Sequence, residues 1–354
     1  MEPGSLNLNI LVGLDFDKKT YKAAEKQTLT FSLTNESKET IRVLKWHTPL
    51  EGVKSNMFNV EHEGKKAVYL GRVYKRGVPT EDDYLTLEPG QTVKMGVDLT
   101  EEYDIADAGS YSVRYRAEFL HAGVEEAKVL MKKYMMPPEV TAVAVKAKEA
   151  TFKLEESRPP KQEGGIQIEW LTRMKTLARM PLTINDCSGS QENIIKAALQ
   201  QAIKIADEAR SALSNTPEGA RQKARRYREW FGDYEATRYD IVNTNFDNIW
   251  DALVNQDLIF TCDDSERAYA YVRPSKPYEI YLGQAFWKAP LTGTDSQGGV
   301  IVHEMSHFYV VASTDDHVYG QPKCRELAKK DPDSAIGNAD SHEYFAENHP
   351  RLNM

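Results

Sequence analysis

The sequence has 354 residues, of which 41% are hydrophobic, and its 53 acidic side chains outnumber its 45 basic ones to give a net charge of −8. This length and apolar content suffice for two domains, each with its own core. The acidic balance excludes the basic surface with which proteins neutralise nucleic-acid phosphates, and no apolar run approaches the roughly 18 residues that span a bilayer. Neither nucleic acid nor a membrane is therefore expected as a partner.

The first residues, MEPGS, resemble a cloning remnant, and no charged segment followed by an apolar one marks a signal peptide. A native secretion signal could have been removed, so this absence says little about localisation. The three cysteines, Cys187, Cys262 and Cys324, allow at most one internal disulfide. One bridge would suit an exported enzyme, whereas three reduced thiols would suit a cytosolic one.

From residue 6 to about residue 145 the chain consists of short runs in which apolar and polar residues alternate, separated by Gly, Pro and Asn. Alternation with period two predicts strands, and half a dozen such runs predict an all-β antiparallel sandwich. No catalytic residue types cluster here, and His47, His62 and His121 are scattered. The runs are NLNILVGLDF, TLTFSLTN, IRVLKW, AVYLGRVY, QTVKMGVDL and GSYSVRYRAEFL.

A charged segment followed by a Pro- and Gly-rich one, KAKEATFKLEESRPPKQEGG, covers residues 146–165. Such composition is typical of an exposed linker. We therefore expect two domains: an all-β domain over residues 1–170, whose end is a linker at about 146–170, and a second domain over residues 171–354.

Beyond the linker the apolar residues recur with helical spacing. In SGSQENIIKAALQQAIKIADEARSAL they form one stripe, preceded by Ser190 as the expected N-cap. Further helices are predicted over residues 217–230 and 239–254, and the runs LIFTC, RAYAYV and YEIYLG are typical of strands. The second domain is therefore predicted to be α+β, mostly helical with a small sheet.

The segment GGVIVHEMSHFYVV contains three chemically active residues, His303, Glu304 and His307, in an apolar helical pattern. A spacing of four puts both imidazoles on one face of a helix, where two nitrogens can reach one zinc ion. Zinc makes a bound water acidic, and Glu304 beside it could take a proton from that water as it attacks a peptide carbonyl. The apolar flanks predict a buried helix, in which such polar residues need a reason to be present.

A catalytic zinc needs a third protein ligand and an open fourth position. Several acids and histidines follow the motif, and spacing alone does not choose among them. The candidates are Asp315, Asp316, His317, Asp340, His342, Glu343, Glu347 and His349.

Residues 303–320, HEMSHFYVVASTDDHVYG, resemble the aspzincin pattern of the deuterolysin and peptidyl-Lys metalloendopeptidase family, in which HExxH is followed by GTxDxxYG. The similarity continues through AYAYV, AFWKAPLTGTDSQGG and NADSHEYFAENHP, so it covers roughly residues 180–354. It implies a zincin-like metalloprotease domain with one zinc ion per chain. The implied ligands are His303, His307 and Asp316, with Glu304 as the catalytic base and Tyr319 as a donor to the oxyanion.

The resemblance also bears on the cysteines and on one loop. Cys187 and Cys262 correspond to a disulfide that the family shares. Two positions depart from the family: Ser313 stands where the motif has its first glycine, and Gly283 stands where a second disulfide of fungal members is lost. These departures bear on loop geometry and local stability, not on the ligand set.

Asp340 and Glu343 lie three residues apart on an expected helix and so present two carboxylates on one face. Paired acids of this kind are usually solvated or hold a helix terminus. In the lysine-specific branch of the family, matching acidic positions line the pocket for the residue after the cut, where they would bind an ammonium or guanidinium group. The resemblance thus implies cleavage of proteins or peptides on the N-terminal side of Lys (or Arg).

Some bacterial relatives are exported enzymes whose N-terminal segment blocks activity until it is removed, and they act as toxins or nutrient-acquiring proteases. By resemblance, residues 1–170 would be such a propeptide domain, an inhibitor within the same chain of a secreted zymogen and virulence factor. Lysines of the linker, Lys146, Lys148, Lys153 and Lys161, would then be sites of self-cleavage. Three alternatives stay open: a permanent N-terminal binding module, a non-catalytic binding protein with a structural zinc, and an enzyme whose third ligand is Glu343.

Overall fold

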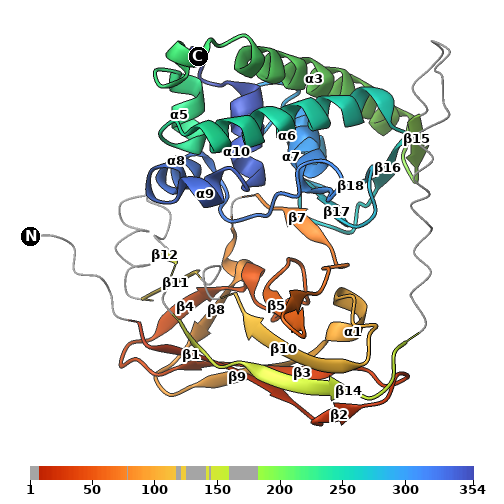
Figure 1. Cartoon of the computed structure of the whole chain (residues 1–354), viewed down its shortest axis with the longest axis vertical. Coiled ribbons are helices and arrows are strands. Elements are labelled where there is room, and N and C mark those ends of the chain that lie inside the picture. Colours follow the sequence, from red (N-terminus) through yellow and green to blue (C-terminus); the bar gives the residue numbers. More distant parts are fainter. Residues whose placement is uncertain (1–7, 78, 117–120, 125–140, 143–144, 159–181) are drawn as a thin grey trace, which may run out of the picture. The chain divides into compact units, whose positions relative to one another are not determined.

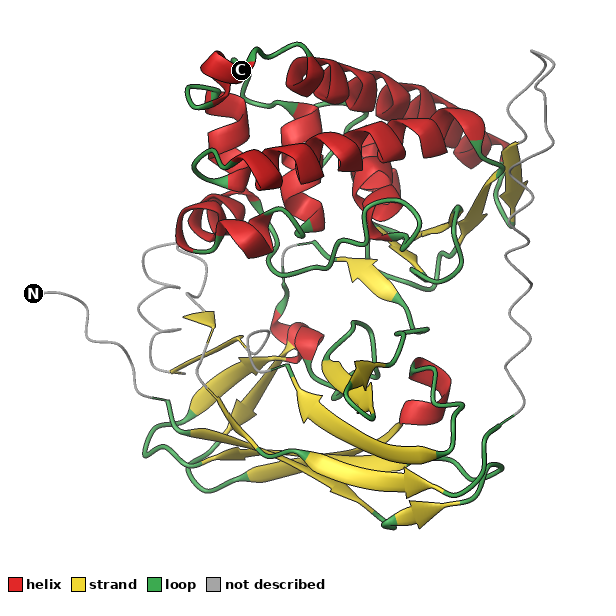
Figure 2. Cartoon of the chain, viewed as in Figure 1, coloured by secondary structure: helices red, strands yellow, loops and turns green. Residues whose placement is uncertain are grey.

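The computed structural model describes residues 8–77, 79–116, 121–124, 141–142, 145–158 and 182–354 (Figure 1). The chain divides into two compact units: unit 1 comprises residues 1–71 and 79–173, and unit 2 comprises residues 72–78 and 174–354. Unit 1 is rich in strands and unit 2 is mainly helical (Figure 2). The prediction of a β-rich N-terminal region followed by a helical C-terminal region is confirmed.

Unit 1 contains three sheets among its described residues, with strand orders β13-β1-β3-β9, β2-β14-β10-β5-β6 and β12-β11-β4-β8. Neighbouring strands run antiparallel except that β13 lies parallel to β1 and β2 lies parallel to β14. One short helix, α1 (Leu99–Glu102), follows β9. The strands are β1 (Ile10–Phe16), β2 (Thr20–Tyr21), β3 (Thr28–Asn35), β4 (Ile41–Leu44), β5 (Phe58–His62), β6 (Lys65–Lys66), β8 (Tyr84–Leu87), β9 (Thr92–Asp98), β10 (Gly109–Tyr115), β11 (His121–Val124), β12 (Thr141–Ala142), β13 (Val145–Ala147) and β14 (Ala150–Leu154).

The alternating pattern of β3 accounts for the core of unit 1. Leu29, Phe31 and Leu33 are fully buried, whereas the Thr and Ser residues between them are partly exposed. Successive side chains of a strand point to opposite faces, so these three residues form one apolar face. Phe31 meets Tyr115 of β10 edge-on at a centroid distance of 5.4 Å, which joins the first two sheets.

Strands β13 and β14 occupy residues that the sequence analysis assigned to the linker. Ala150, Phe152 and Leu154 alternate with exposed residues and face inward. The charged residues around them obscured this short alternation, so the predicted start of the linker at residue 146 is wrong. Residues 159–170 of the predicted linker lie outside the described residues.

Unit 2 contains a five-stranded sheet in the order β15-β16-β18-β17-β7. Strands β15, β16 and β18 are parallel to one another, and β17 and β7 are each antiparallel to the neighbour before them. The last strand comes from the N-terminal half of the sequence, where AVYLGRVY was expected to join the sandwich; that expectation is wrong, because alternation predicts a strand but not its partner. The strands are β7 (Val73–Lys75), β15 (Leu182–Asn185), β16 (Leu258–Cys262), β17 (Ala270–Val272) and β18 (Glu279–Leu282).

The helices of unit 2 largely follow the predicted ranges. The first is capped by Ser188 rather than Ser190, because Ser188 stands three residues before Gln191 and the two form a capping box. The helix predicted over residues 217–230 is broken into two. The helices are α3 (Gly189–Ser214), α4 (Glu218–Arg221), α5 (Arg225–Phe231), α6 (Ala236–Asn255), α7 (Gln297–His307), α8 (Gln321–Lys330), α9 (Pro332–Ala335) and α10 (Ala339–Glu347).

Helix α7 lies at the centre of unit 2. It packs against α3, α6 and α10 on one side and against β17, β18 and β7 on the other (Figure 1). Buried Arg226 of α5 donates to the carbonyl oxygen of Phe345 at 2.8 Å and so holds the C-terminal end of α10. The site described below is built on these enclosed helices.

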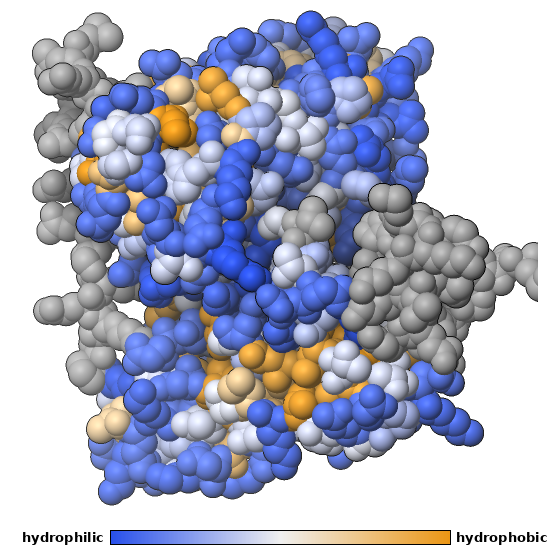
Figure 3. Space-filling view, turned by 180° about the vertical axis from the view of Figure 1, so that it is seen from behind, coloured by the Kyte–Doolittle hydropathy of each residue, from blue (hydrophilic) through white to orange (hydrophobic). Residues whose placement is uncertain are grey.

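The surface of unit 2 is mainly hydrophilic on the face seen in Figure 3, with apolar groups scattered among charged ones. Its largest exposed apolar side chains are Ile241, Leu291, Tyr309 and Val310. Within the described part of the chain, no helix is long and apolar enough to cross a membrane.

One buried histidine of α10 makes the stability of unit 2 depend on pH. His342 is enclosed by Phe231 and Phe246, its Nδ1 donates to the carbonyl oxygen of Asn338 at 3.0 Å, and its Nε2 accepts from Asn245 at 3.1 Å. Both hydrogen bonds suit a neutral imidazole, and burial lowers the pKa of His342 to about 4.

We predict that His342 costs the protein about 2 kcal/mol of unfolding free energy between pH 6.5 and pH 5, because the unfolded chain takes up a proton there that the folded chain does not. Stability is therefore lost as the pH falls. Urea unfolding at several pH values should show a flatter dependence in His342→Gln than in the wild type. His349→Gln, at an exposed histidine, is the matched control, and equal slopes in the wild type and His342→Gln would contradict the prediction.

Candidate metal centre

The candidate centre begins with helix α7, which carries the HExxH residues. Ser296 caps the helix by accepting from the Gly299 N–H, and Glu347 in turn accepts from the Ser296 N–H and hydroxyl at 2.7 and 2.8 Å. Every residue of the helix is buried, as its apolar flanks predicted. His303 and His307 lie one turn apart with centroids separated by 4.9 Å.

Three ligand atoms converge on one point beside this helix. The Nε2 atoms of His303 and His307 are 3.2 Å apart, and Asp316 Oδ1 lies 3.2 Å from the first and 3.5 Å from the second. Three ligands bound to a tetrahedral zinc at about 2.0–2.1 Å lie about 3.3–3.4 Å from one another. The nitrogen and oxygen atoms present therefore fit one zinc ion in both type and spacing.

The other ring nitrogens are held by neighbouring oxygens. His307 Nδ1 donates to the carbonyl oxygen of Thr314 at 2.8 Å, and His303 Nδ1 lies 2.9 Å from Asp340 Oδ1. With its proton on Nδ1, each imidazole directs the lone pair of Nε2 to the common point.

The remaining downstream candidates lie elsewhere. Glu347 binds Ser296, His349 Nδ1 bonds the Thr294 hydroxyl at 3.0 Å, and His342 lies in its own buried pocket. Asp315, next to Asp316, is only partly buried and its N–H donates to the carbonyl oxygen of Gly337. His317 is partly buried and is not among the residues that gather as possible ligands.

Ser313, which stands where the family motif has a glycine, lies in the loop that carries Asp316. Ser313 has a φ of 53°, in the left-handed region that glycine adopts without strain. A serine there costs about 1 kcal/mol, yet the loop still brings Asp316 to the two histidines.

Glu304 and Tyr319 lie beside the three candidate ligand residues. Glu304 is fully buried, and burial raises the pKa of its carboxyl group to about 8. A nearby divalent cation would favour the charged carboxylate and lower this value. The Tyr319 hydroxyl donates to the carbonyl oxygen of Tyr74 in β7 at 2.8 Å, so it reaches the carbonyl of an extended chain.

Asp340 and Glu343 form a second acidic group on the far side of His303, and it holds a lysine. The Lys75 ammonium lies 2.9 Å from Asp340 Oδ1, 2.6 Å from Glu343 Oε2 and 3.7 Å from Asp295 Oδ1, and its side chain is 1% exposed. Burial disfavours this charge, but the three carboxylates raise the pKa of Lys75 well above its ordinary value. The pocket is therefore built for a cation.

Two members of this pocket escaped the sequence analysis. Lys75 lies more than 200 residues before the acids it meets, and no local pattern links them. Asp295 stands in AFWKAPLTGTDSQGG, a run that carries the family resemblance, but nothing in its spacing pointed to a cation.

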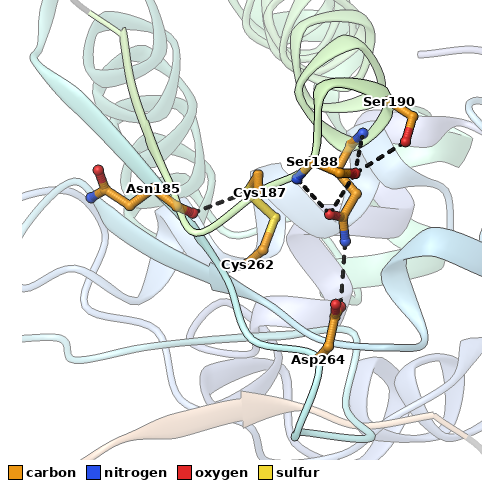
Figure 4. The surroundings of a disulfide bond; sticks show 7 residues. Asn185, Cys187, Ser188, Ser190, Cys262 and Asp264 are labelled. Carbon is orange, nitrogen blue, oxygen red and sulfur yellow. Dashed lines mark hydrogen bonds between the residues drawn. A yellow bond between two sulfur atoms is a disulfide. The ribbon is translucent and has the colours of Figure 1, made fainter.

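The expected disulfide is present, and it ties α3 to the sheet. Cys187, just before α3, is bonded to Cys262 at the end of β16, with their Cα atoms 5.2 Å apart (Figure 4). Ser188, the cap of α3, follows directly, and Gln191 reaches Asp264 at 3.3 Å. Cys324 is buried and unbonded to another sulfur.

A buried HExxH helix with a converging aspartate, an adjacent carboxylate and an extended strand paired to the sheet beside it is typical of a metal-dependent peptidase. Comparisons with known proteins agree. The aspzincin family model, described as lysine-specific metallo-endopeptidase, matches residues 217–347, and a second peptidase family, HRXXH, matches residues 133–273.

Individual relatives match most of the chain. An extracellular protease of Aeromonas hydrophila is 38% identical over 331 residues, which cover 92% of this chain and 89% of the relative. A peptidyl-Lys metalloendopeptidase of Grifola frondosa is 32% identical over 337 residues, which cover 90% of this chain and 87% of the relative. A solved zinc peptidase from Grifola frondosa, 39% identical, covers 47% of this chain and 100% of its own, with a TM-score of 0.43. The chain therefore belongs to the aspzincin family and is a zinc metalloendopeptidase.

We predict that Asp316→Ala lowers the zinc content of the purified protein to a small fraction of the wild-type value, because the two histidines alone leave zinc under-coordinated. Metal analysis after dialysis checks this. Asp315→Ala, at the adjacent residue, is the matched control and should keep its zinc. Equal zinc in both variants would instead favour Glu343 as the third ligand.

Proposed function

We propose that this chain is a secreted zinc metalloendopeptidase that cleaves on the N-terminal side of Lys (or Arg) and is made as a latent proenzyme. One zinc per chain would be held by His303, His307 and Asp316 in a zincin-like catalytic domain of residues 171–354. Residues 1–170, as a β-sandwich with a linker at its end, would be the inhibitory propeptide. The observation that carries the specificity is the Lys75 ammonium bound between Asp340 and Glu343 beside the candidate metal centre.

The residues around this centre have separable roles. When bound, zinc supplies a Lewis acid that makes water more acidic and polarises a carbonyl group. Glu304 accepts a proton from the attacking water and delivers it to the leaving amide nitrogen. The Tyr319 hydroxyl, which meets a peptide carbonyl at 2.8 Å, donates to the oxygen that gains negative charge. The dry surroundings of Glu304 strengthen each of these interactions.

Specificity for Lys follows from charge and shape. A buried pair of carboxylates is costly unless a cation compensates it. The pocket therefore favours a side chain that is long enough to place an ammonium group between the two carboxylates. The rings of Tyr269 and Tyr344 lie 5.7 and 5.9 Å from the Lys75 nitrogen and add cation–π attraction. An apolar side chain would leave both carboxylates unpaired.

The proposals of secretion and of latency are supported by different observations. The Aeromonas hydrophila relative is named an extracellular protease, and similarity over most of the chain supports the same localisation here. Latency is supported by β7, a segment of the N-terminal half that belongs to unit 2 and lies against Tyr319. This segment argues against a permanent N-terminal binding module, since such a module has no need to place a strand against Tyr319. Buried Glu304 argues against a purely structural zinc.

We expect Glu304→Gln to keep its zinc and to lose peptide hydrolysis by about 10²–10⁴-fold, because the amide cannot carry the proton. Both properties are measured on the same preparation in a Lys75→Ala background, which empties the acidic pocket. Glu326→Gln, at an exposed acid of α8, is the control. Loss of zinc together with activity would show that Glu304 acts on the metal site rather than on the proton.

We expect the double change Asp340→Asn and Glu343→Gln, in the same background, to lower the ratio of kcat/KM for Lys over Leu peptides by about 100-fold, because the Lys ammonium then enters a buried pocket without a counter-charge. Peptide hydrolysis with equal zinc loading measures this ratio. Cuts before apolar residues in the parent chain would contradict the assignment of the pocket.

A further inference from the structure

Residues 72–77 enter unit 2 as an added strand. Strand β7 pairs antiparallel with β17 in the register Val73↔Val272, Tyr74↔Tyr271 and Lys75↔Ala270. The Tyr269 N–H extends the pairing by donating to the carbonyl oxygen of Lys75 at 3.0 Å. Addition of an extended chain to a sheet edge is a common mode of peptide recognition, in which the main chain gives affinity and pockets give specificity.

Two separate contacts meet at one peptide bond of this strand. The carbonyl oxygen of Tyr74 accepts from the Tyr319 hydroxyl at 2.8 Å. The side chain of Lys75 fills the acidic pocket. The proposed oxyanion donor and the specificity pocket therefore contact the two residues joined by the bond between Tyr74 and Lys75.

The side chain of Tyr74, the residue before this bond, also packs against unit 2. The Tyr74 ring stacks on Tyr271 with centroids 4.8 Å apart, and Tyr271 stacks on Tyr281 at 4.6 Å. The guanidinium group of Arg72 lies 4.9 Å from the Tyr271 ring. Side chains on both sides of the bond thus fix its position along the strand, so the register does not depend on Lys75 alone.

We infer that the chain's own Tyr74–Lys75 bond is bound as a substrate and is the first bond that the enzyme hydrolyses during its activation. This inference rests on the proposed function and names the site of its processing. One water is consumed: the C–N bond breaks, the hydroxyl of the water joins the Tyr74 carbonyl carbon to give a carboxylate, and the leaving nitrogen of Lys75 receives a proton through Glu304. Until that cut, Lys75 keeps other lysines out of the pocket.

The lysines that the sequence analysis favoured are less suitable. Lys146 and Lys153 lie in β13 and β14, where the main chain is already paired with other strands. Lys148 lies in the short exposed connection between these strands, and Lys161 lies outside the described residues. Among the described lysines, Lys75 is the one that meets both acids of the pocket.

In the test, zinc is added to the metal-free full chain, and the masses and N-terminal sequences of the products are measured over time. We expect two fragments, residues 1–74 and 75–354, and a rate constant that stays the same over a tenfold dilution, because the cut occurs within one chain. Lys75→Ala should slow cleavage at this bond by about 100-fold or more. Lys148→Ala is the matched control and should cut as the wild type does.

A second measurement needs no hydrolysis. With zinc present, Glu304→Gln should fail to bind a labelled peptide with a single Lys, and adding Lys75→Ala should raise the affinity at least tenfold by vacating the pocket. The double variant Glu304→Gln with Lys148→Ala is the control and should also fail to bind the peptide. Equal binding by all three variants would overturn the occupation of the pocket by Lys75.

The outcomes separate this inference from the proposed function. A first cut at any other residue, or an intact wild-type chain while Lys75→Ala cleaves an external Lys peptide, overturns the inference and leaves the protease assignment standing. If no variant cleaves any Lys peptide, the proposed function fails and the inference fails with it.

Discussion

Compensation of buried charge is the constraint on which unit 2 depends. Within one enclosed region lie His303, Glu304, Asp316, Asp340 and Glu343, each with its side chain almost wholly buried. An isolated buried charge would cost several kcal/mol, so each needs a partner of opposite sign. The Lys75 ammonium compensates one part of this group, and a zinc ion fits the other. Helix α7, the Asp316 loop and α10 are arranged so that these two cations can sit on either side of one histidine.

The scaffold that encloses these charges could be predicted where the pattern is local. The HExxH spacing predicts His303 and His307 on one face of a buried helix, because the helical repeat alone brings them together. Asp316 was reached through the family resemblance, since a loop residue has no periodicity to mark it. The first residue of a helix was harder to predict. The side chains of Ser188 and Ser190 both suit a cap of α3, and the choice between them depends on Gln191, three residues after Ser188.

Other parts of the site were not predictable from the sequence for a physical reason. The run that contains Lys75 alternates like any strand of unit 1, and alternation carries no information about which sheet a strand joins. Lys75 meets Asp340 and Glu343 because residues 72–78 belong to unit 2, although residues 79–173 that follow them belong to unit 1. A pairing across 265 residues is selected by the complete fold and its charge balance, not by any segment alone.

The three-residue strand β17 has a consequence for the solubility of the protein. With β7 in place, the sheet of unit 2 presents no unpaired side of β17; without it, that strand becomes a bare row of N–H and C=O groups. Such rows attract extended chains of any origin, including other copies of the same protein, and are a recognised cause of aggregation. Strand β7 thus covers an edge at which copies of the protein could otherwise associate.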